Sequence, residues 1–190
     1  MNGPSYTLFD GNRKAGHGSL AEVAVRYKHA VARGPAHAVL LFDDRSGRNI
    51  DVDTRGSDAD VAARYTPPPE PPRGRGRPKL GVVAREVTLL PRHWEWLSAQ
   101  PGGASVTLRR LVDEARRAGG GKERTRQAHE RAYHFMVAIA GDLPGFEEAT
   151  RALFANDRAT LESLIAHWPH DIRAHAVALA FERLRTDEHQ

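Results

Sequence analysis

The sequence contains no cysteine, which excludes disulfide bonds and thiolate metal sites. It also lacks an apolar run long enough to span a bilayer, and its first residues do not have the pattern of a signal peptide. We therefore expect a cytoplasmic protein that makes no contact with a membrane.

Acidic residues are scarce in the middle of the chain, where basic residues are concentrated. Residues 67–126 contain 13 basic and 6 acidic side chains, whereas residues 127–190 contain 6 basic and 10 acidic ones. Residues 1–66 are nearly balanced, with 9 basic and 8 acidic side chains. The formal net charge of +4 therefore hides a basic centre, which is typical of polyanion binding confined to one segment.

A run of prolines marks the clearest boundary in the chain. Five of the six residues from 67 to 72 are proline, which disfavours helix and sheet and favours an extended spacer. A proline-rich ligand for the groove of another protein is the alternative. We expect four parts: an α+β domain (1–66), a linker with a basic arm (67–84), a strand-helix-helix module (85–118) and a helical domain (122–190).

The first part has the pattern of a ββαββα unit with an antiparallel sheet. Residues 6–9 and 13–17 predict a hairpin around the Asp10-Gly11-Asn12 turn. Ser19 and Glu22 form a capping box that begins a helix, which ends at Gly34-Pro35. Strands are then expected at 39–42 and 49–53, and a short helix capped by Ser57 follows.

The basic arm has the residue order of an AT-hook. Its core is Arg73-Gly74-Arg75-Gly76-Arg77-Pro78-Lys79. Over about nine residues it resembles the hooks of high-mobility-group chromatin proteins. Gly74 and Gly76 lack the Cβ that would hold the backbone off a groove floor, and Pro78 favours an extended Arg77. The order of the residues, rather than their charge alone, indicates DNA.

That resemblance implies binding to the minor groove of A·T-rich DNA, which is narrow and strongly negative. Arg75 and Arg77 would lie along the groove, while Arg73 and Lys79 would meet phosphates. A solvated, charged linker is the alternative, because such tracts also join domains.

The module after the arm resembles a ribbon-helix-helix DNA-binding domain. Residues 85–90 alternate like a short strand, Pro91 begins a helix, and Pro101-Gly102-Gly103 ends it. A second helix then begins near Ser105 or Thr107 and is expected to stop at the glycines of residues 118–121. The resemblance implies a homodimer whose paired strands enter the major groove, with Ser105 and Thr107 at phosphates.

The side of the strand that faces DNA is not fixed by this pattern. If Val87 and Leu89 face the core, Glu86 and Thr88 face the groove; in the reverse phase, Arg85 faces it with Val87 and Leu89. We take Arg85 and Thr88 as the candidate contacts. An ordinary strand-helix-helix piece inside a larger domain is the alternative.

The last part is expected to be a small bundle of four helices. They are predicted at residues 127–140, after Pro144, after Asn156-Asp157, and from Asp171 to about Leu184. One of these helices could instead dock on the strand-helix-helix module. A protein partner bound through these helices is a further hypothesis.

Neither carboxylates nor histidines are arranged as a catalytic or metal site. The first part carries Asp43, Asp44, Asp51, Asp53, Asp58 and Asp60. Paired carboxylates could hold Mg²⁺ for a nuclease, but turn and solvent-face positions explain them better. An acidic face that folds back on the basic arm is our preferred interpretation. His129, His134, His167, His170 and His175 lack the spacing of a zinc site, so we expect no metal and no cofactor.

The whole layout resembles an uncharacterised bacterial family, domain of unknown function 2239. The resemblance rests on GRGRPKLGVVAREVTLLPRHWEWL (74–97) and AGDLPGFEEATRALF (140–154), and it implies no activity. We expect a non-enzymatic DNA-binding protein of the nucleoid, a transcription regulator or nucleoid-associated protein that acts as a homodimer. The alternative is an adaptor or antitoxin-like protein that binds a protein partner and touches DNA incidentally.

Overall fold

The computed structural model describes residues 5–34, 37–68, 83 and 85–182. The chain forms two compact units, one made of residues 1–67 with 124–190 and the other of residues 68–123. Each unit is described by itself below. Within the described ranges, none of the helices has the length and apolar content needed to cross a membrane.

The first unit begins with the predicted hairpin. Strands β1 (Tyr6–Asp10) and β2 (Arg13–Gly18) pair antiparallel, and the turn between them places Gly11 at a φ of +56°. The register shifts after Leu8, which pairs with Gly16 while Phe9 pairs with Lys14. Ala15 is therefore the extra residue of a β-bulge on this edge strand.

Both helices that follow strands in this part begin at the predicted capping residues, Ser19 and Ser57. In α1 (Leu20–Ala32), the Ser19 side chain accepts from the Glu22 backbone while the Glu22 side chain accepts from Ser19. In α2 (Asp58–Tyr65), Ser57 and Asp60 make the same reciprocal pair. Such boxes satisfy backbone N–H groups that would otherwise lack partners at a helix start. Both helix predictions are confirmed.

The strand after α1 is confirmed, but the next one is shorter than predicted. Strand β3 spans Val39–Asp43, whereas β4 contains only Arg48–Asn49. Ile50 still donates its backbone N–H to Leu41 at 2.8 Å, and then the ladder ends. Ile50 and Val52 pack against the core as expected, so their burial does not require a long strand.

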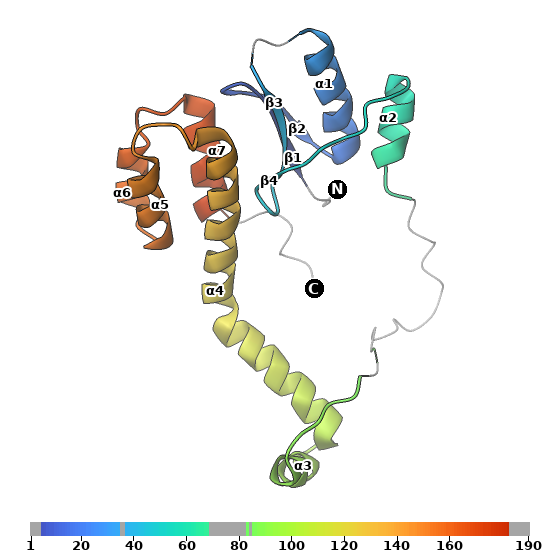
Figure 1. Cartoon of the computed structure of the whole chain (residues 1–190). Helices are drawn as coiled ribbons and strands as arrows, with labels where there is room; N and C mark the ends of the chain where they lie inside the picture. The colour runs from blue at the N-terminus through green and yellow to red at the C-terminus, as the bar shows by residue number, and fades with distance from the viewer. Residues whose placement is uncertain (1–4, 35–36, 69–82, 84, 183–190) are drawn as a thin grey trace. The chain divides into compact units, whose positions relative to one another are not determined.

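The strands form a four-stranded antiparallel sheet in the order β2-β1-β3-β4. The predicted α+β class is confirmed at this level. Side chains alternate between the two faces of a strand, and here both faces are covered. Leu8 and Leu41 pack with Val23 of α1, while Phe9 and Phe42 lie in the core formed with the C-terminal helices. Figure 1 shows α1 and α7 on opposite sides of the sheet.

The C-terminal helices agree closely with the predicted ones. They are α5 (Phe146–Phe154), α6 (Arg158–Leu164) and α7 (His170–Phe181), preceded by the last part of α4 (Gly103–Ala140). Asp157 caps α6 by accepting from the Thr160 backbone, as the Asn156-Asp157 break predicted. Instead of forming a separate bundle, these helices share one hydrophobic core with Phe9 and Phe42 of the sheet.

An aromatic cluster joins the two ends of the chain. The rings of Phe9, Phe42 and Phe135 lie with centroids 4.8 to 6.0 Å apart, and each is fully buried. The His175 ring lies 4.7 Å from that of Phe135. Residues 1–66 and 122–190 were expected as separate domains, whereas in the structure they share one hydrophobic core.

The second unit contains α3 (Pro91–Ser98) and the first part of α4. Pro91 occupies the first turn of α3, as predicted. The expected stop at residues 118–121 is wrong, because α4 continues without interruption through its glycines. A glycine costs about 1 kcal/mol in a helix relative to alanine but does not forbid it. The flanking Ala, Arg, Lys and Glu residues are good helix formers, and they carry the helix across.

Candidate functional site

The AT-hook core lies outside the residues that the structure describes. This applies to Arg73, Arg75, Gly76, Arg77, Pro78 and Lys79. Their role in the minor groove therefore stays a prediction from the sequence.

The predicted strand at residues 85–90 pairs with no strand among the residues that the structure describes. Arg85 and Thr88 are exposed, and residues 85–90 have neither helix nor strand assignment. A ribbon of two chains would obtain its ladder hydrogen bonds only from a second copy. The two residues remain available to a ligand on the surface of the unit.

The two proposed phosphate contacts differ in exposure. Both lie in the first turns of α4, where backbone N–H groups attract anions. Ser105 is exposed, whereas Thr107 is only 1% exposed. The Thr107 hydroxyl thus has no surface from which to reach a phosphate, and it belongs to the interior of this small unit.

Arginines cover much of the described surface of the second unit. Arg85, Arg92, Arg109, Arg110 and Arg116 are all exposed. Arg110 Nη1 lies 3.0 Å from Glu114 Oε1, a surface pair one helical turn apart that contributes little to stability. The remaining positive charge is available for a polyanion.

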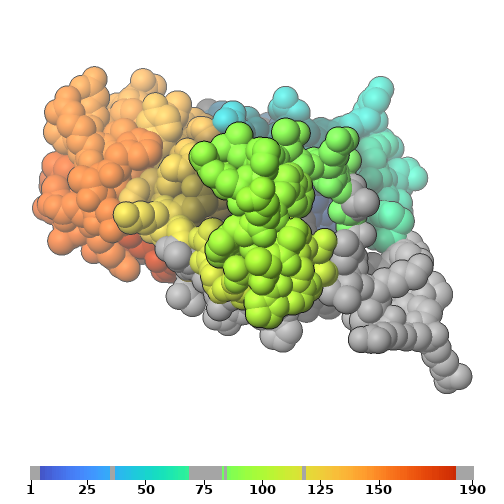
Figure 2. Space-filling view, turned by 90° about the horizontal axis from the view of Figure 1, so that it is seen from below, coloured from blue at the N-terminus to red at the C-terminus, as the bar shows by residue number. Residues whose placement is uncertain are grey.

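The second unit also exposes an unusual amount of apolar surface. We define its apolar face as Trp94, Trp96, Val106, Leu111 and Val112, which are between 36% and 55% exposed. In the described part of this unit, only Leu97 and Thr107 are buried. Figure 2 shows these segments of α3 and α4 in green at the surface. A unit of this size with so small a core normally requires an additional partner for stability.

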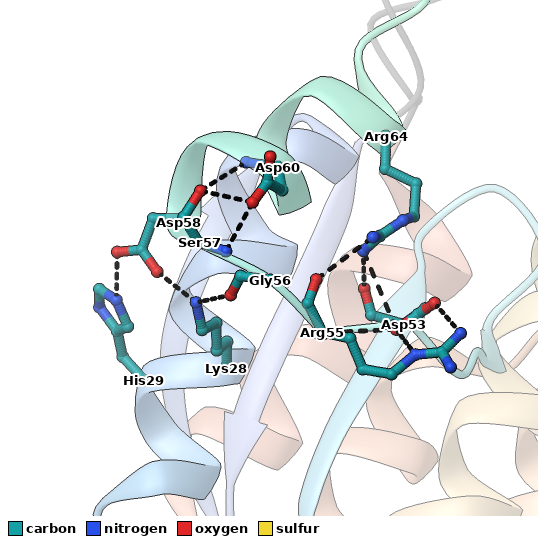
Figure 3. A network of polar contacts seen from close by, with 9 residues as sticks. All are labelled: Lys28, His29, Asp53, Arg55, Gly56, Ser57, Asp58, Asp60 and Arg64. Atoms are coloured by element: carbon teal, nitrogen blue, oxygen red, sulfur yellow. Dashed lines mark hydrogen bonds and ion pairs between the residues drawn. The ribbon is translucent and has the colours of Figure 1, made fainter.

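In the first unit, Asp53, Asp58 and Asp60 each make hydrogen bonds or ion pairs with neighbouring residues (Figure 3). Arg55 binds Asp53 through two hydrogen bonds, Nε to Oδ1 at 2.9 Å and Nη2 to Oδ2 at 2.7 Å. Arg64 donates to the backbone oxygen of Asp53 at 2.6 Å. The hydrogen bonds from Arg55 hold the pKa of Asp53 well below its usual range.

The neighbouring carboxylates have partners of their own. Asp58 lies 2.8 Å from Lys28 Nζ and 2.6 Å from His29 Nε2, and these two groups lower its pKa. Asp60 accepts from the backbone and the hydroxyl of Ser57, and these hydrogen bonds lower the pKa of Asp60 as well. Because these carboxylates already have partners, they are poorly suited to hold either Mg²⁺ or the basic arm.

A polar cluster that the sequence did not indicate lies where the sheet meets α7. Thr7 donates its hydroxyl to Asp44 Oδ2 at 3.0 Å, and both side chains are almost fully buried. His175 Nε2, from α7, lies 3.3 Å from Asp44 Oδ1. The angles at this contact do not form a good hydrogen bond, and neither atom has another partner among the described residues. We therefore describe Asp44 and His175 as a close contact between two buried polar side chains.

The ionisation of Asp44 is set by opposing effects. Burial raises the pKa of this carboxyl group, but the contact with His175 and the Thr7 hydroxyl lower it, and the net direction is downward. His17 contributes a second imidazole, with Nδ1 3.4 Å from Asp44 Oδ2 and its side chain 53% exposed. A turn aspartate and a helix histidine 131 positions apart carry no pattern that links them in the sequence.

This cluster does not have the form of an active site. Its hydroxyl and carboxylate are closed off from solvent, so no substrate could reach them in this arrangement. The described residues also contain no group of three or more His, Asp or Glu side chains that could hold a metal ion. We assign the cluster a structural role, which is to fix α7 on the sheet.

These features define an α+β protein in which helices cover both faces of an antiparallel sheet, joined to a smaller unit that is basic and partly apolar at its surface. The chain belongs to the family described as uncharacterized proteins conserved in bacteria, domain of unknown function 2239, which it matches over residues 5–180. The resemblance to this family is confirmed. No curated protein and no solved structure matches the chain.

Proposed function

We propose that this chain is a non-enzymatic bacterial DNA-binding protein, a transcription regulator or nucleoid-associated protein. It acts as a homodimer on A·T-rich duplexes through the arm at residues 73–79 and the unit that follows. The observation that carries this proposal is the basic charge of residues 67–126, which contain 13 basic side chains and only 6 acidic ones.

The exposure of the arginines in the second unit supports this proposal. Arg85, Arg92 and Arg109 are exposed, and such side chains can replace the counterions that surround a duplex. With about five to eight phosphate contacts per dimer, most of the affinity would come from counterion release. The arm would then add the preference for A·T-rich sequences.

The state of the acidic residues in the first unit also supports it. We expected an acidic face that folds back on the arm, yet Asp53 and Asp58 have cationic partners within their own unit. Competition for the arm from these two carboxylates is correspondingly weak.

The arm is tested by changing two arginines together. We expect Arg75→Ala with Arg77→Ala to weaken binding most on A·T-rich duplexes, measured by fluorescence anisotropy at fixed salt. A matched control is Arg45→Ala with Arg151→Ala, which removes two exposed arginines of the first unit. Equal losses on A·T-rich and G·C-rich duplexes would leave only nonspecific charge and remove the minor-groove interpretation.

A second candidate function is an adaptor that binds a protein through the apolar face of the second unit. The exposure of Trp96 and Val112, at 50% and 55%, favours this alternative. Light scattering distinguishes the DNA-binding homodimer from the adaptor. A native chain that is a dimer, together with a Trp96→Ser, Val112→Ser double variant that is a monomer, supports the homodimer. A monomeric native chain that does not shift DNA at physiological salt supports the adaptor.

A further inference from the structure

A pocket of about 250 Å³ lies on the first unit between α1 and the edge strand β2. It is lined by Leu8, Ala15, Arg26, His29, Ala30 and Arg33. Leu8 and Ala30 are buried and form an apolar wall of the pocket, while Arg26 and Arg33 are exposed. Nothing in the proposed DNA contacts involves this pocket, because those contacts lie in residues 73–109.

A glycine beside the pocket lets the Arg26 side chain lie close against the edge strand. Gly16 pairs with Leu8, so a side chain there would lie on the face of the sheet that α1 covers. A Cβ at Gly16 would lie 3.0 Å from Cδ of Arg26 and 3.7 Å from Cβ of Leu8. The bulge at Ala15 interrupts the ladder at the same place, and bulges on edge strands often re-aim residues beside binding sites.

The charges around the pocket are strongly one-sided. Arg26 lies on α1 and Arg33 is its C-cap residue, seven positions or about two helical turns further along. Neither guanidinium group has a hydrogen bond or ion pair with a described residue, and Glu22 interacts with Arg26 only at longer range. His29 is already engaged, because its Nε2 lies 2.6 Å from Asp58. Arg26 and Arg33 therefore line the same small hollow without an ionic partner among the described residues.

We propose that this pocket binds a phosphate group. A guanidinium group presents donors in a planar fork that matches phosphate oxygens, and it carries its charge at any physiological pH. The last turns of α1 present the negative end of the helix dipole, which is equivalent to about half a charge and is outweighed by two full cations. The volume suits a compact phosphate group such as pyrophosphate better than a bulky ligand.

Such a group has two sources, a free phosphate-bearing small molecule or a backbone phosphate of DNA. To test this, inorganic pyrophosphate is titrated into the full chain. Binding is measured by isothermal titration calorimetry and by the NMR chemical shifts of the backbone amides of residues 15, 26 and 33. We expect Arg26→Ala and Arg33→Ala each to weaken binding about tenfold, since each loses a charge-assisted hydrogen bond. Ala15→Leu should weaken it too, because the added side chain occupies the hollow without altering charge.

The matched control is Arg45→Ala, which removes an exposed arginine outside the pocket. Pyrophosphate binding that survives in this control and is lost in the two pocket variants supports a small-molecule ligand. If pyrophosphate does not bind, but the pocket variants alone weaken duplex binding, the phosphate is supplied by DNA. Equal effects of all three arginine substitutions on both ligands, or no effect on either, would overturn the proposal. The arm variants lose duplex binding independently of these outcomes, so failure of one proposal leaves the other testable.

Discussion

Gly47 sits in the turn between β3 and β4, against the backbone of α4. Its φ is +68°, and a Cβ at this position would lie 1.7 Å from the backbone oxygen of Arg131. Gly47→Ala therefore combines strain in the left-handed region with a clash that only backbone movement relieves. We expect the free energy of unfolding to fall by about 3 kcal/mol, measured by urea denaturation.

Gly34 is a suitable control for this substitution. Its φ is +66°, but no atom lies within 4 Å of the position that a Cβ would occupy. Gly34→Ala should lower the free energy of unfolding by only about 1 kcal/mol, because it adds the strain of a left-handed backbone without a clash. If both substitutions cost the same, the close approach between the turn and α4 is absent in solution.

Asp44 should make stability depend on pH in a definite direction. Its pKa is lowered in the folded state by His175 and Thr7, so its stabilising effect is complete above the unfolded pKa of about 3.9. That effect is lost as the pH falls through the lower, folded pKa. Asp44→Asn should reduce the free energy of unfolding at pH 7 by about 2 kcal/mol, because the buried Thr7 hydroxyl and the His175 side chain lose the carboxylate that they contact.

The comparison between pH 7 and pH 3 provides the test for Asp44. Acid should destabilise the native chain more than the Asp44→Asn variant, as measured by thermal unfolding at both pH values. The other depressed carboxylates, such as Asp53 and Asp171, are present in both proteins and cancel in the difference. An identical acid response of the two proteins would contradict the lowered pKa of Asp44.

Residues could be predicted from the sequence wherever their function is local. Ser19, Ser57 and Asp157 cap helices as expected, because a cap depends on neighbours within three positions. Asp44 was expected only as a turn residue, and its turn position is real. Its burial depends on a helix that begins more than a hundred residues later, which no local pattern contains.

At the scale of elements, α4 is where sequence and structure differ most. Gly119 and Gly121 lie within the helix, and no heavy atom would lie within 4 Å of a Cβ at either position. Gly119→Ala with Gly121→Ala should therefore stabilise this stretch by about 2 kcal/mol in total. Slower hydrogen exchange at residues 112–125 is the expected result. Unchanged exchange would mean that the chain is broken at the glycines, as the sequence alone suggested.

Most other elements could be predicted because their boundaries carry strong signals. The Asp10-Gly11-Asn12 turn, the break at Asn156-Asp157 and Pro91 each fixed one boundary correctly. Strand β4 was predicted too long, because alternation at Ile50 and Val52 reports burial rather than ladder hydrogen bonds. The expected strand at residues 85–90 makes no ladder with the described part of the chain, and its pairing in a dimer stays a prediction.

At the scale of the whole molecule, the hydrophobic core of the first unit is formed by both the N-terminal sheet and the C-terminal helices. Phe9 and Phe42 are fully buried in the core that the C-terminal helices complete. A fragment of residues 1–66 would expose both rings, which costs about 4 kcal/mol of burial and most of a small domain's stability. We expect this fragment to lack a cooperative thermal transition. Adding the separate fragment of residues 124–190 should restore one.

A cooperative transition in the first fragment alone would contradict the shared core. One sequence signal did point to it: the run from Val39 to Phe42 is apolar at every position. A continuous run of this kind is typical of a strand covered on both faces. The pattern does not reveal which segment covers the second face, and for that reason two separate domains were expected.

The central claim is that the basic middle of the chain binds A·T-rich duplex DNA. The most direct measurement is a titration of the full chain on A·T-rich and G·C-rich duplexes at two salt concentrations, with its mass in solution determined alongside. We predict a dimer that prefers the A·T-rich duplex, with log affinity falling against log salt at a slope of about −5 to −7. Equal affinity for both duplexes, or a slope near zero, would contradict the account.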